Sequence, residues 1–384
     1  MISTRSGAWI RIAFAMFAVG WGANQFSPML IVYRHELNLS AAAVAGLFAI
    51  YAATLVPGLL IGGPASDRYG RRPVVLPFVL LSPVATMLLI LGPRNLAILA
   101  ASRALAGLCS GVVFGSATAW VQDLSPGTGL SARRAALALT AGFGLGPVVA
   151  AVLAQWAGDP LQVPYLPHLV IGTVAIAIIL RAPGTTVTVA RTRRRWPPAA
   201  IRSRPFWLAV APAAPLVFGS VSLAIVVLPE EVTSARTLSA GFAGLMTALA
   251  FAAGTGVQPL ARRLPASTGN IAGLLCATAG TALGFAAVQG PDRVLAGLAA
   301  VFLGLAYGLC LVSGLRQAEQ LAGPAERGAV VACYYALAYI GFAAPYLAAG
   351  LGALAGKAGA LALLAAAAAV LAAWTAGYAL LVAR

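Results

Sequence analysis

The segment GGPASDRYGRR, residues 62–72, places one carboxylate and three arginines in a short gap between two apolar runs. The carboxylate, Asp67, is one of only 9 acidic residues in a chain of 384. Because charged residues are this scarce, a cluster of them between apolar runs marks a point where the chain leaves a hydrophobic environment and enters it again.

The composition excludes a soluble protein. Hydrophobic residues make up 61% of the chain and charged residues 9%, whereas a soluble domain carries about 25% charged residues. We therefore expect an integral membrane protein whose surroundings are the lipid bilayer. The net charge of +16 does not indicate a nucleic-acid partner, because the arginines are scattered between apolar runs instead of gathered on one face.

The four cysteines all fall inside apolar segments, at spacings that suit no metal ion. We expect them to be small buried side chains, and we expect neither a metal nor a cofactor.

Twelve apolar runs are long enough to cross a bilayer, for which a helix needs roughly 20 residues. They cover residues 9–33, 40–64, 73–92, 95–121, 132–157, 163–181, 206–228, 239–258, 267–289, 294–320, 328–350 and 358–382. The sequence therefore predicts an all-α polytopic membrane protein with twelve transmembrane helices.

The basic residues support this count. With the N-terminus in the cytoplasm, seventeen basic residues fall in inner segments, five in outer segments and three within spans. Cytoplasmic loops carry such an excess of positive charge. We expect a multi-pass protein of the inner (cytoplasmic) membrane with both termini in the cytoplasm.

The chain divides into two halves of six spans that repeat one another, as is typical of transporters. Four residues of the opening segment recur at one constant offset: Gly63, Asp67, Arg71 and Arg72 correspond to Gly254, Gln258, Arg262 and Arg263. We expect an N-terminal six-helix bundle at 1–181, a cytoplasmic linker at 182–205 and a C-terminal six-helix bundle at 206–384. The arginine-rich linker could instead have a nucleic-acid or regulatory role.

Residues 63–72 fit the pattern G-x-x-x-D-R-x-G-R-R. In this position, between the second and third spans, the pattern resembles the cytoplasmic loop signature of the major facilitator superfamily, closest to its drug/proton antiporter-like exporters. The resemblance implies two pseudo-symmetric six-helix bundles that move a solute by alternating access.

The residue types of this loop have physical reasons. Glycine at position 63 is expected to let two helices approach closely, and glycine at position 70 to permit the tight turn. The resemblance implies a gating latch in which Arg71 contacts Asp67 and Asp123, with Arg68 and Arg72 beside it. The alternative is plain positive-inside topology, which requires the arginines but neither the acid nor the glycines.

A weaker latch is expected in the second half, between Arg262 or Arg263 and Glu319. Arg316 and Glu319 lie one helical turn apart, so they could pair with each other instead.

Arg103, with Gly107 and Gly111, resembles the fourth-span pattern R-x-x-x-G-x-x-x-G of the family. It lies about two turns inside the membrane, where an unpaired charge is costly, so we expect it to contact substrate or to influence a proton-carrying group. The alternative is that its side chain extends towards the outer headgroups.

Gly142, Gly146 and Pro147 resemble the fifth-span signature G-x-x-x-G-P-x-x-G-G, which marks exporters that exchange substrate for protons. Alanines replace the final glycine pair. We expect the small residues to let this span pack closely on the opposite half, and the proline to bend it.

A substrate cavity is expected at mid-membrane between the halves. Its candidate lining residues are polar or aromatic: Trp21, Asn24, Gln25, Arg103, Tyr307 and Tyr334. Amides in hydrocarbon require partners, so Asn24 and Gln25, followed by Pro28, form the best pocket candidate. Hydrogen bonding between helices is the alternative role for these amides.

No carboxylate lies at mid-membrane in the first, fourth or seventh span, so a lipophilic cation is disfavoured as substrate. An uncharged, aromatic or anionic solute facing Arg103 fits better. Proton coupling is expected to fall on Glu230, Glu231 or Asp123, under the influence of Arg103. His168 is expected to be structural more than a proton carrier.

Together these features predict a secondary transporter that exports a small organic molecule, works as a monomer and is driven by the proton gradient. Uptake by symport or facilitated diffusion is the alternative. A non-transporting membrane receptor is a remote one, because no segment between spans is long enough for a sensor domain. An enzyme is not expected, since no Ser/His/Asp set or pair of carboxylates gathers at one depth.

Overall fold

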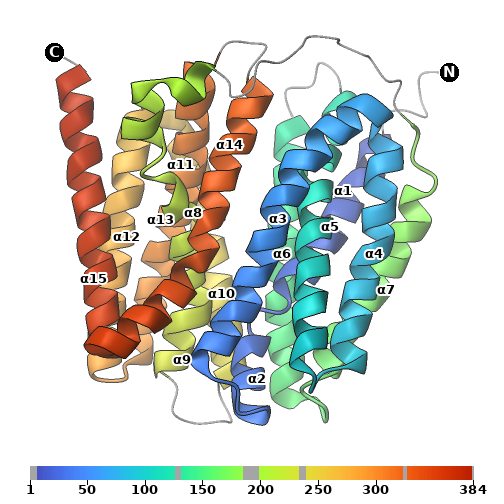
Figure 1. Ribbon diagram of the computed structural model, residues 1–384, viewed down its shortest axis with the longest axis horizontal. Coiled ribbons are helices and arrows are strands. Elements are labelled where there is room, and N and C mark those ends of the chain that lie inside the picture. Colours follow the sequence, from blue (N-terminus) through green and yellow to red (C-terminus); the bar gives the residue numbers. More distant parts are fainter. Residues whose placement is uncertain (1–6, 126–130, 185–198, 233–238, 323–326, 383–384) are drawn as a thin grey trace. The chain divides into compact units, whose positions relative to one another are not determined.

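The computed structural model describes residues 7–125, 131–184, 199–232, 239–322 and 327–382, and within these ranges the chain forms helices and no strand (Figure 1). The predicted all-α fold is confirmed. The chain divides into two compact units, one of residues 1–39 and 46–191 and the other of residues 40–45 and 192–384. Residues 185–198, most of the expected linker, lie outside the described residues.

The first unit contains long apolar helices, and its first predicted span is divided into two shorter helices. They are α1 (Ala8–Asn24), α2 (Met29–Glu36), α3 (Ala41–Tyr69), α4 (Arg71–Leu91), α5 (Leu96–Asp123), α6 (Ser131–Trp156) and α7 (Leu166–Ile179), with a short 3-10 turn at Val163–Tyr165.

The first predicted span, residues 9–33, is interrupted between α1 and α2. Pro28 has no N–H to give to the carbonyl of Asn24, one turn before it. The N–H of Ser27 donates to the carbonyl of Asn24 at 3.0 Å. In a regular helix the same N–H would donate to the carbonyl of Ala23. The break therefore leaves the carbonyl of Ala23 available to a side chain.

Helices α3 and α5 cross in close contact because glycines line the crossing. A Cβ atom on Gly107 would lie 2.2 Å from the carbonyl oxygen of Tyr51, and one on Gly111 would lie 2.1 Å from that of Leu55. No side chain fits these positions, so backbone packs directly on backbone, as in other membrane helix pairs.

In the described residues the second unit contains α-helices of very different lengths. They are α8 (Ala214–Ser222), α9 (Leu228–Val232), α10 (Ser239–Gly256), α11 (Gln258–Arg263), α12 (Ala266–Gln289), α13 (Arg293–Leu321), α14 (Arg327–Ile340) and α15 (Ala344–Val382). The predicted seventh span has π-helical turns at Phe206–Val210 and Leu223–Val227, on either side of α8.

Nine segments of the described chain are long and apolar enough to cross a bilayer. One of them, Val330–Leu381, turns at Gly356, whose φ of 74° is not helical, so it contains two crossings. The apolar helix Val163–Ile179 is shorter, and the first crossing is divided between α1 and α2. With these features counted, the described helices account for the twelve predicted spans.

Candidate functional site

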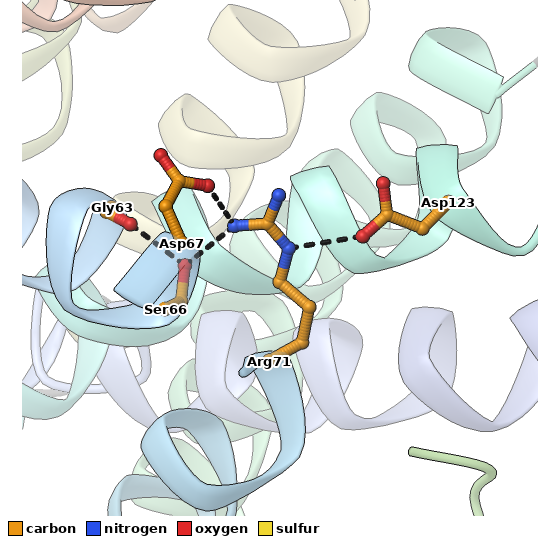
Figure 2. A network of polar contacts seen from close by, with 5 residues as sticks. All are labelled: Gly63, Ser66, Asp67, Arg71 and Asp123. Atoms are coloured by element: carbon orange, nitrogen blue, oxygen red, sulfur yellow. Dashed lines mark hydrogen bonds and ion pairs between the residues drawn. The ribbon is translucent and has the colours of Figure 1, made fainter. Parts of the chain in front are cut away.

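The structure brings Asp67, Arg71 and Asp123 together at one end of the first unit (Figure 2). Arg71 Nη1 donates to Asp67 Oδ1 at 2.5 Å, and Arg71 Nε donates to Asp123 Oδ2 at 3.0 Å. The same Nη1 also donates to Ser66 Oγ at 2.8 Å, and that hydroxyl donates to the carbonyl of Gly63. One guanidinium therefore joins the ends of α3 and α5. We call Asp67, Arg71 and Asp123 the Arg71 cluster.

The backbone explains why these three groups meet. Helix α3 ends at Tyr69, and Gly70 adopts φ 95°, a conformation that residues with a side chain rarely adopt. Helix α4 therefore starts at once, with Arg71 as its first residue. A cation at a helix N-terminus and a carboxylate at a C-terminus, as at Asp123, both oppose the helix dipole, and their ion pair offsets this cost.

The other residues of this loop have separate contacts. Arg72 Nη2 donates to the carbonyl of Leu180 at 2.8 Å, and Arg68 lies over the ring of Tyr69. The expected close approach at Gly63 is wrong within the described residues: a Cβ there would meet nothing within 4 Å, whereas one on Gly62 would lie 2.8 Å from Val112. The close approach belongs to the preceding residue because Gly62, and not Gly63, faces α5.

The second half arranges its charges differently. In the described part of the chain, neither Arg262 nor Arg263 forms an ion pair with Glu319, and Arg316 does not pair with Glu319 either. Arg316 Nη1 instead donates to the carbonyls of Ala261, Arg262 and Leu264, at 3.1, 3.0 and 3.0 Å. The last carbonyls of α11 lack helical partners, so a cation here completes the helix end.

Arg103 on α5 is an unusual charge, because it is only 1% exposed and has no carboxylate partner among the described residues. Its guanidinium carbon lies 4.3 Å from the ring centre of Phe26 and 4.6 Å from that of Tyr51. Arg103 Nη1 donates to the carbonyl of Ala23 at 3.2 Å, which is the carbonyl that the break between α1 and α2 leaves available. Its Nε has no hydrogen-bond partner.

Magnitudes show that this charge is tolerated but not neutralised. Burying an ion costs several kcal/mol even after relaxation. Each ring face returns about 2 kcal/mol when desolvated, and a hydrogen bond from a charged group returns about 1.5–3 kcal/mol. These gains offset the cost but leave a full positive charge inside the bundle. The side chain is buried among Phe26, Tyr51 and the carbonyl of Ala23, so it does not extend towards the outer headgroups.

Three candidate cavity residues lie near Arg103, on α1 and at the break. Asn24 Nδ2 donates to the carbonyl of Phe143 on α6 at 2.8 Å, and its Oδ1 accepts from Ser27. Gln25 Nε2 donates to Thr86 Oγ1 at 3.1 Å, and its Oε1 has no partner. Trp21 is 6% exposed, and its Nε1 has no partner. The amides therefore join helices, and two polar groups stay unsatisfied.

The two candidates of the second unit are buried aromatic residues. Tyr307 contacts the rings of Phe218 and Phe251, with centroids 5.9 and 5.7 Å away. The hydroxyl of Tyr334 donates to the carbonyl of Cys310 at 2.6 Å, which occupies its one hydrogen.

The candidate proton-coupling carboxylates lie in ion pairs at helix ends, as far as contacts are described for them. Asp123 belongs to the Arg71 cluster. Glu231 lies 2.6 Å from the ammonium of Lys357, and Lys357 directly follows the turn at Gly356. Glu230 is the residue before Glu231 on α9. Within the described residues no three His, Cys, Asp or Glu side chains gather as metal ligands would.

Gly142 and Gly146 of α6 face their own unit, which corrects the expectation that they pack on the opposite half. A Cβ on Gly142 would lie 2.3 Å from the carbonyl oxygen of Phe17, and one on Gly146 would lie 2.7 Å from that of Trp21. The reason is that α1 fills the groove that these glycines leave. Pro147 is buried within α6.

Sequence reasoning missed several residues of the site. Ser66 holds Arg71, and Phe26 and Tyr51 hold Arg103. Aromatic residues in apolar spans give no individual signal. Pro28 gives one, because a proline within a span removes one N–H and so frees a carbonyl nearby.

Comparison with known proteins places these features in context. The chain matches the family model described as Major Facilitator Superfamily over residues 12–345. It is 25% identical over 144 residues to the quinolone resistance protein NorA of Staphylococcus aureus, and this stretch is 37% of each protein. It is 33% identical over 84 residues to the inner membrane transport protein YnfM of Escherichia coli, covering 21% of this chain and 20% of that protein. These matches thus span well under half the length of either relative.

Two solved structures share the fold. The nucleoside transporter NupG has a TM-score of 0.70 at 13% identity, covering 98% of this chain and 99% of that one. A mutant of the peptide transporter POT in complex with sulfate has a TM-score of 0.78 at 16% identity, covering 97% and 94%.

The contrast between Arg103 and Arg316 predicts opposite effects of one substitution. Arg316→Met removes three hydrogen bonds from a charged group, a net loss of about 2 kcal/mol, and should lower the melting temperature by about 5 °C. Arg103→Met removes a buried charge without a counter-charge, so the melting temperature should stay or rise. Thermal unfolding of both variants in detergent measures this. A clear fall for Arg103→Met would show that its charge is balanced within the protein.

Proposed function

The chain belongs to the major facilitator superfamily of transporters, and we propose that it exports a small organic solute across the membrane in exchange for protons. The partial likeness to a quinolone resistance protein and the pattern of Gly142, Gly146 and Pro147 support export. The family and its structural neighbours favour transport over catalysis.

The observation that carries the proposal is the Arg71 cluster, in which one cation bridges the ends of α3 and α5. In this proposal the two ion pairs of Arg71 form while the cytoplasmic side of the transporter is closed, and they break while that side is open. The side chains of Asp67 and Asp123 are 49% and 40% exposed, so each contact contributes at most about 1 kcal/mol. Two such contacts bias a two-state equilibrium about 30-fold, which is enough to favour one state and still allow exchange.

The substrate class follows from Arg103. A buried cation held by rings and one carbonyl favours a ligand with a negative charge and an aromatic surface. We propose that the substrate is a small aromatic acid that binds beside Arg103 in the first unit, where Trp21, Asn24 and Gln25 are the candidate lining residues. Quinolone antibiotics are aromatic carboxylic acids and serve as a probe.

Proton coupling in this proposal involves the carboxylates at helix ends. Asp123 and Glu231 accept a proton when their ion pairs with Arg71 and Lys357 break, and Glu230 is the adjacent alternative. Arg103 influences them through its charge and through bound substrate.

The proposed setting is the inner (cytoplasmic) membrane, with both termini in the cytoplasm. The protein works there as a monomer, uses no cofactor and is driven by the proton gradient.

Everted membrane vesicles test the direction of transport. When the lumen is made acidic, vesicles that contain the protein should accumulate a fluorescent quinolone, and a protonophore should release it. Vesicles without the protein are the control. Accumulation only in right-side-out vesicles with an acidic exterior would establish uptake instead, and accumulation unaffected by the protonophore would establish a facilitative carrier.

The same assay tests the Arg71 cluster. Arg71→Gln removes both ion pairs and should lower the initial rate of quinolone accumulation several-fold, because the closed cytoplasmic state loses about 2 kcal/mol. Arg68→Gln is the matched control, since Arg68 lies in the same loop and, among the described residues, its neighbour is the ring of Tyr69 and not a carboxylate. Equal rates in the two variants at equal expression would reduce the role of the loop to membrane topology.

A further inference from the structure

A buried chain of hydrogen bonds links the break after α1 to the histidine of α7. Gln25 Nε2 donates to Thr86 Oγ1 at 3.1 Å, and Thr86 Oγ1 lies 2.7 Å from His168 Nδ1. Gln25, Thr86 and His168 are 0%, 2% and 0% exposed and come from three different helical segments. Neither the proton-coupling carboxylates nor the Arg71 cluster takes part in it.

The direction of this chain depends on the tautomer of His168. The amide of Gln25 donates to Thr86, whose hydroxyl oxygen has two lone pairs and can either accept from His168 Nδ1 as well or donate its own hydrogen to it. The tautomer with its hydrogen on Nε2, on the side of the Ala18 carbonyl, accepts at Nδ1, and we take this tautomer as the neutral state. Two polar atoms stay unused: Gln25 Oε1 has no partner, and His168 Nε2 has the carbonyl of Ala18 nearby but no hydrogen bond of good geometry.

The imidazole ring is held tightly against α1. A Cβ on Gly22 would lie 2.4 Å from both Cε1 and Nε2 of His168, so only glycine leaves space for the ring. Gly22 is one residue before Ala23, whose carbonyl holds Arg103. A change in the ring or in its hydrogen bonds therefore acts directly on the segment that positions Arg103.

We propose that His168 is a proton-binding site of the first unit, additional to the carboxylates at the helix ends. A proton from water binds Nδ1, which becomes a donor to Thr86 Oγ1. The hydroxyl hydrogen of Thr86 then turns towards Gln25, whose amide rotates to present the unused Oε1. Loss of the proton to water reverses each step, so that protonation sets the direction of the whole chain.

This site deepens the proposed function, because it rests on proton-driven transport and connects the proton to the Arg103 region. Protonation reverses the amide of Gln25 at the break between α1 and α2. The same break carries Asn24 and frees the carbonyl that binds Arg103. Proton binding and substrate binding thereby act on one short segment.

Other charged groups on the elements packed against α7 lie far from the ring. On α1, Arg11 donates to the carbonyl of Arg181. On α4, Arg72 donates to the carbonyl of Leu180, and Arg71 belongs to the Arg71 cluster. Position 180 is twelve residues beyond His168, about 18 Å along a helix. From the 3-10 turn, Tyr165 lies one turn away, with its hydroxyl 2.8 Å from that of Tyr33.

Nitrogen NMR on the purified full-length protein in nanodiscs tests proton binding without any substrate. The chain has only 2 histidines, so His35→Gln leaves His168 as the single labelled imidazole. We expect a neutral ring protonated on Nε2 at high pH and a doubly protonated ring on titration from about pH 9 to about pH 4. Thr86→Val should make the neutral form a mixture of tautomers, because Nδ1 loses its donor. A ring that stays neutral over the whole range would overturn the proposal.

Proteoliposomes with an imposed proton gradient and a fluorescent quinolone test the link to transport. His35→Gln should accumulate the quinolone as the wild type does, whereas His168→Gln should lose gradient-driven accumulation but keep quinolone exchange. Gradient-driven accumulation by His168→Gln equal to that of His35→Gln would contradict the proposal.

If His168→Gln does not fold, Thr86→Val is measured in its place. This variant should lose part of the gradient-driven accumulation, and accumulation equal to that of the wild type would contradict the link between His168 and transport. If the wild type shows no gradient-driven accumulation, the proposed export function fails, and the NMR titration still decides proton binding at His168.

Discussion

A guanidinium group inside a bundle of apolar helices must find acceptors, and this requirement shapes both units. Arg71 has two carboxylates, and Arg316 has three carbonyls at the end of α11. Arg103 has two aromatic rings and one carbonyl, so its charge is shielded but not balanced. The first two arrangements hold helix ends together, and the third leaves a buried charge without a counter-charge among the described residues.

The surroundings of Arg103 come from backbone irregularities. Pro28 interrupts the first span, and the shifted hydrogen bonds free the carbonyl of Ala23. Gly107, one turn after Arg103, lets α5 approach α3 until Tyr51 can face the guanidinium. Local sequence, helix packing and electrostatics thus converge on one position inside the first unit, and the chain from Gln25 to His168 starts at the same break.

Much of this arrangement could be predicted from the sequence. The apolar runs gave the crossings because bilayer thickness sets the length of a span. The Arg71 cluster could be predicted because Asp67 and Arg71 lie four residues apart around a short loop, and Asp123 lies at the end of another helix. Such arguments need only spacing and polarity.

Other features could not be predicted, for identifiable physical reasons. Pro28 breaks a helix, whereas Pro77 and Pro147 lie inside continuous ones, so a proline alone does not locate a break. The small residues of α6 indicate a close packing face but not which helix fills it. The partners of Arg316 are backbone carbonyls, which every residue carries and which spacing arguments therefore cannot distinguish.

The central claim is that the charge of Arg103 is available to an anionic ligand. Its most direct test is the thermal stability of purified wild-type protein and of Arg103→Met with aromatic carboxylates, including a quinolone, and with aromatic quaternary ammonium ions of similar size. A ligand that binds the folded state raises its stability by mass action. The account predicts that a carboxylate stabilises the wild type but not the variant, and that the ammonium ions stabilise neither. Stabilisation of the wild type by the ammonium ions, or equal stabilisation of both proteins by the carboxylate, would contradict it.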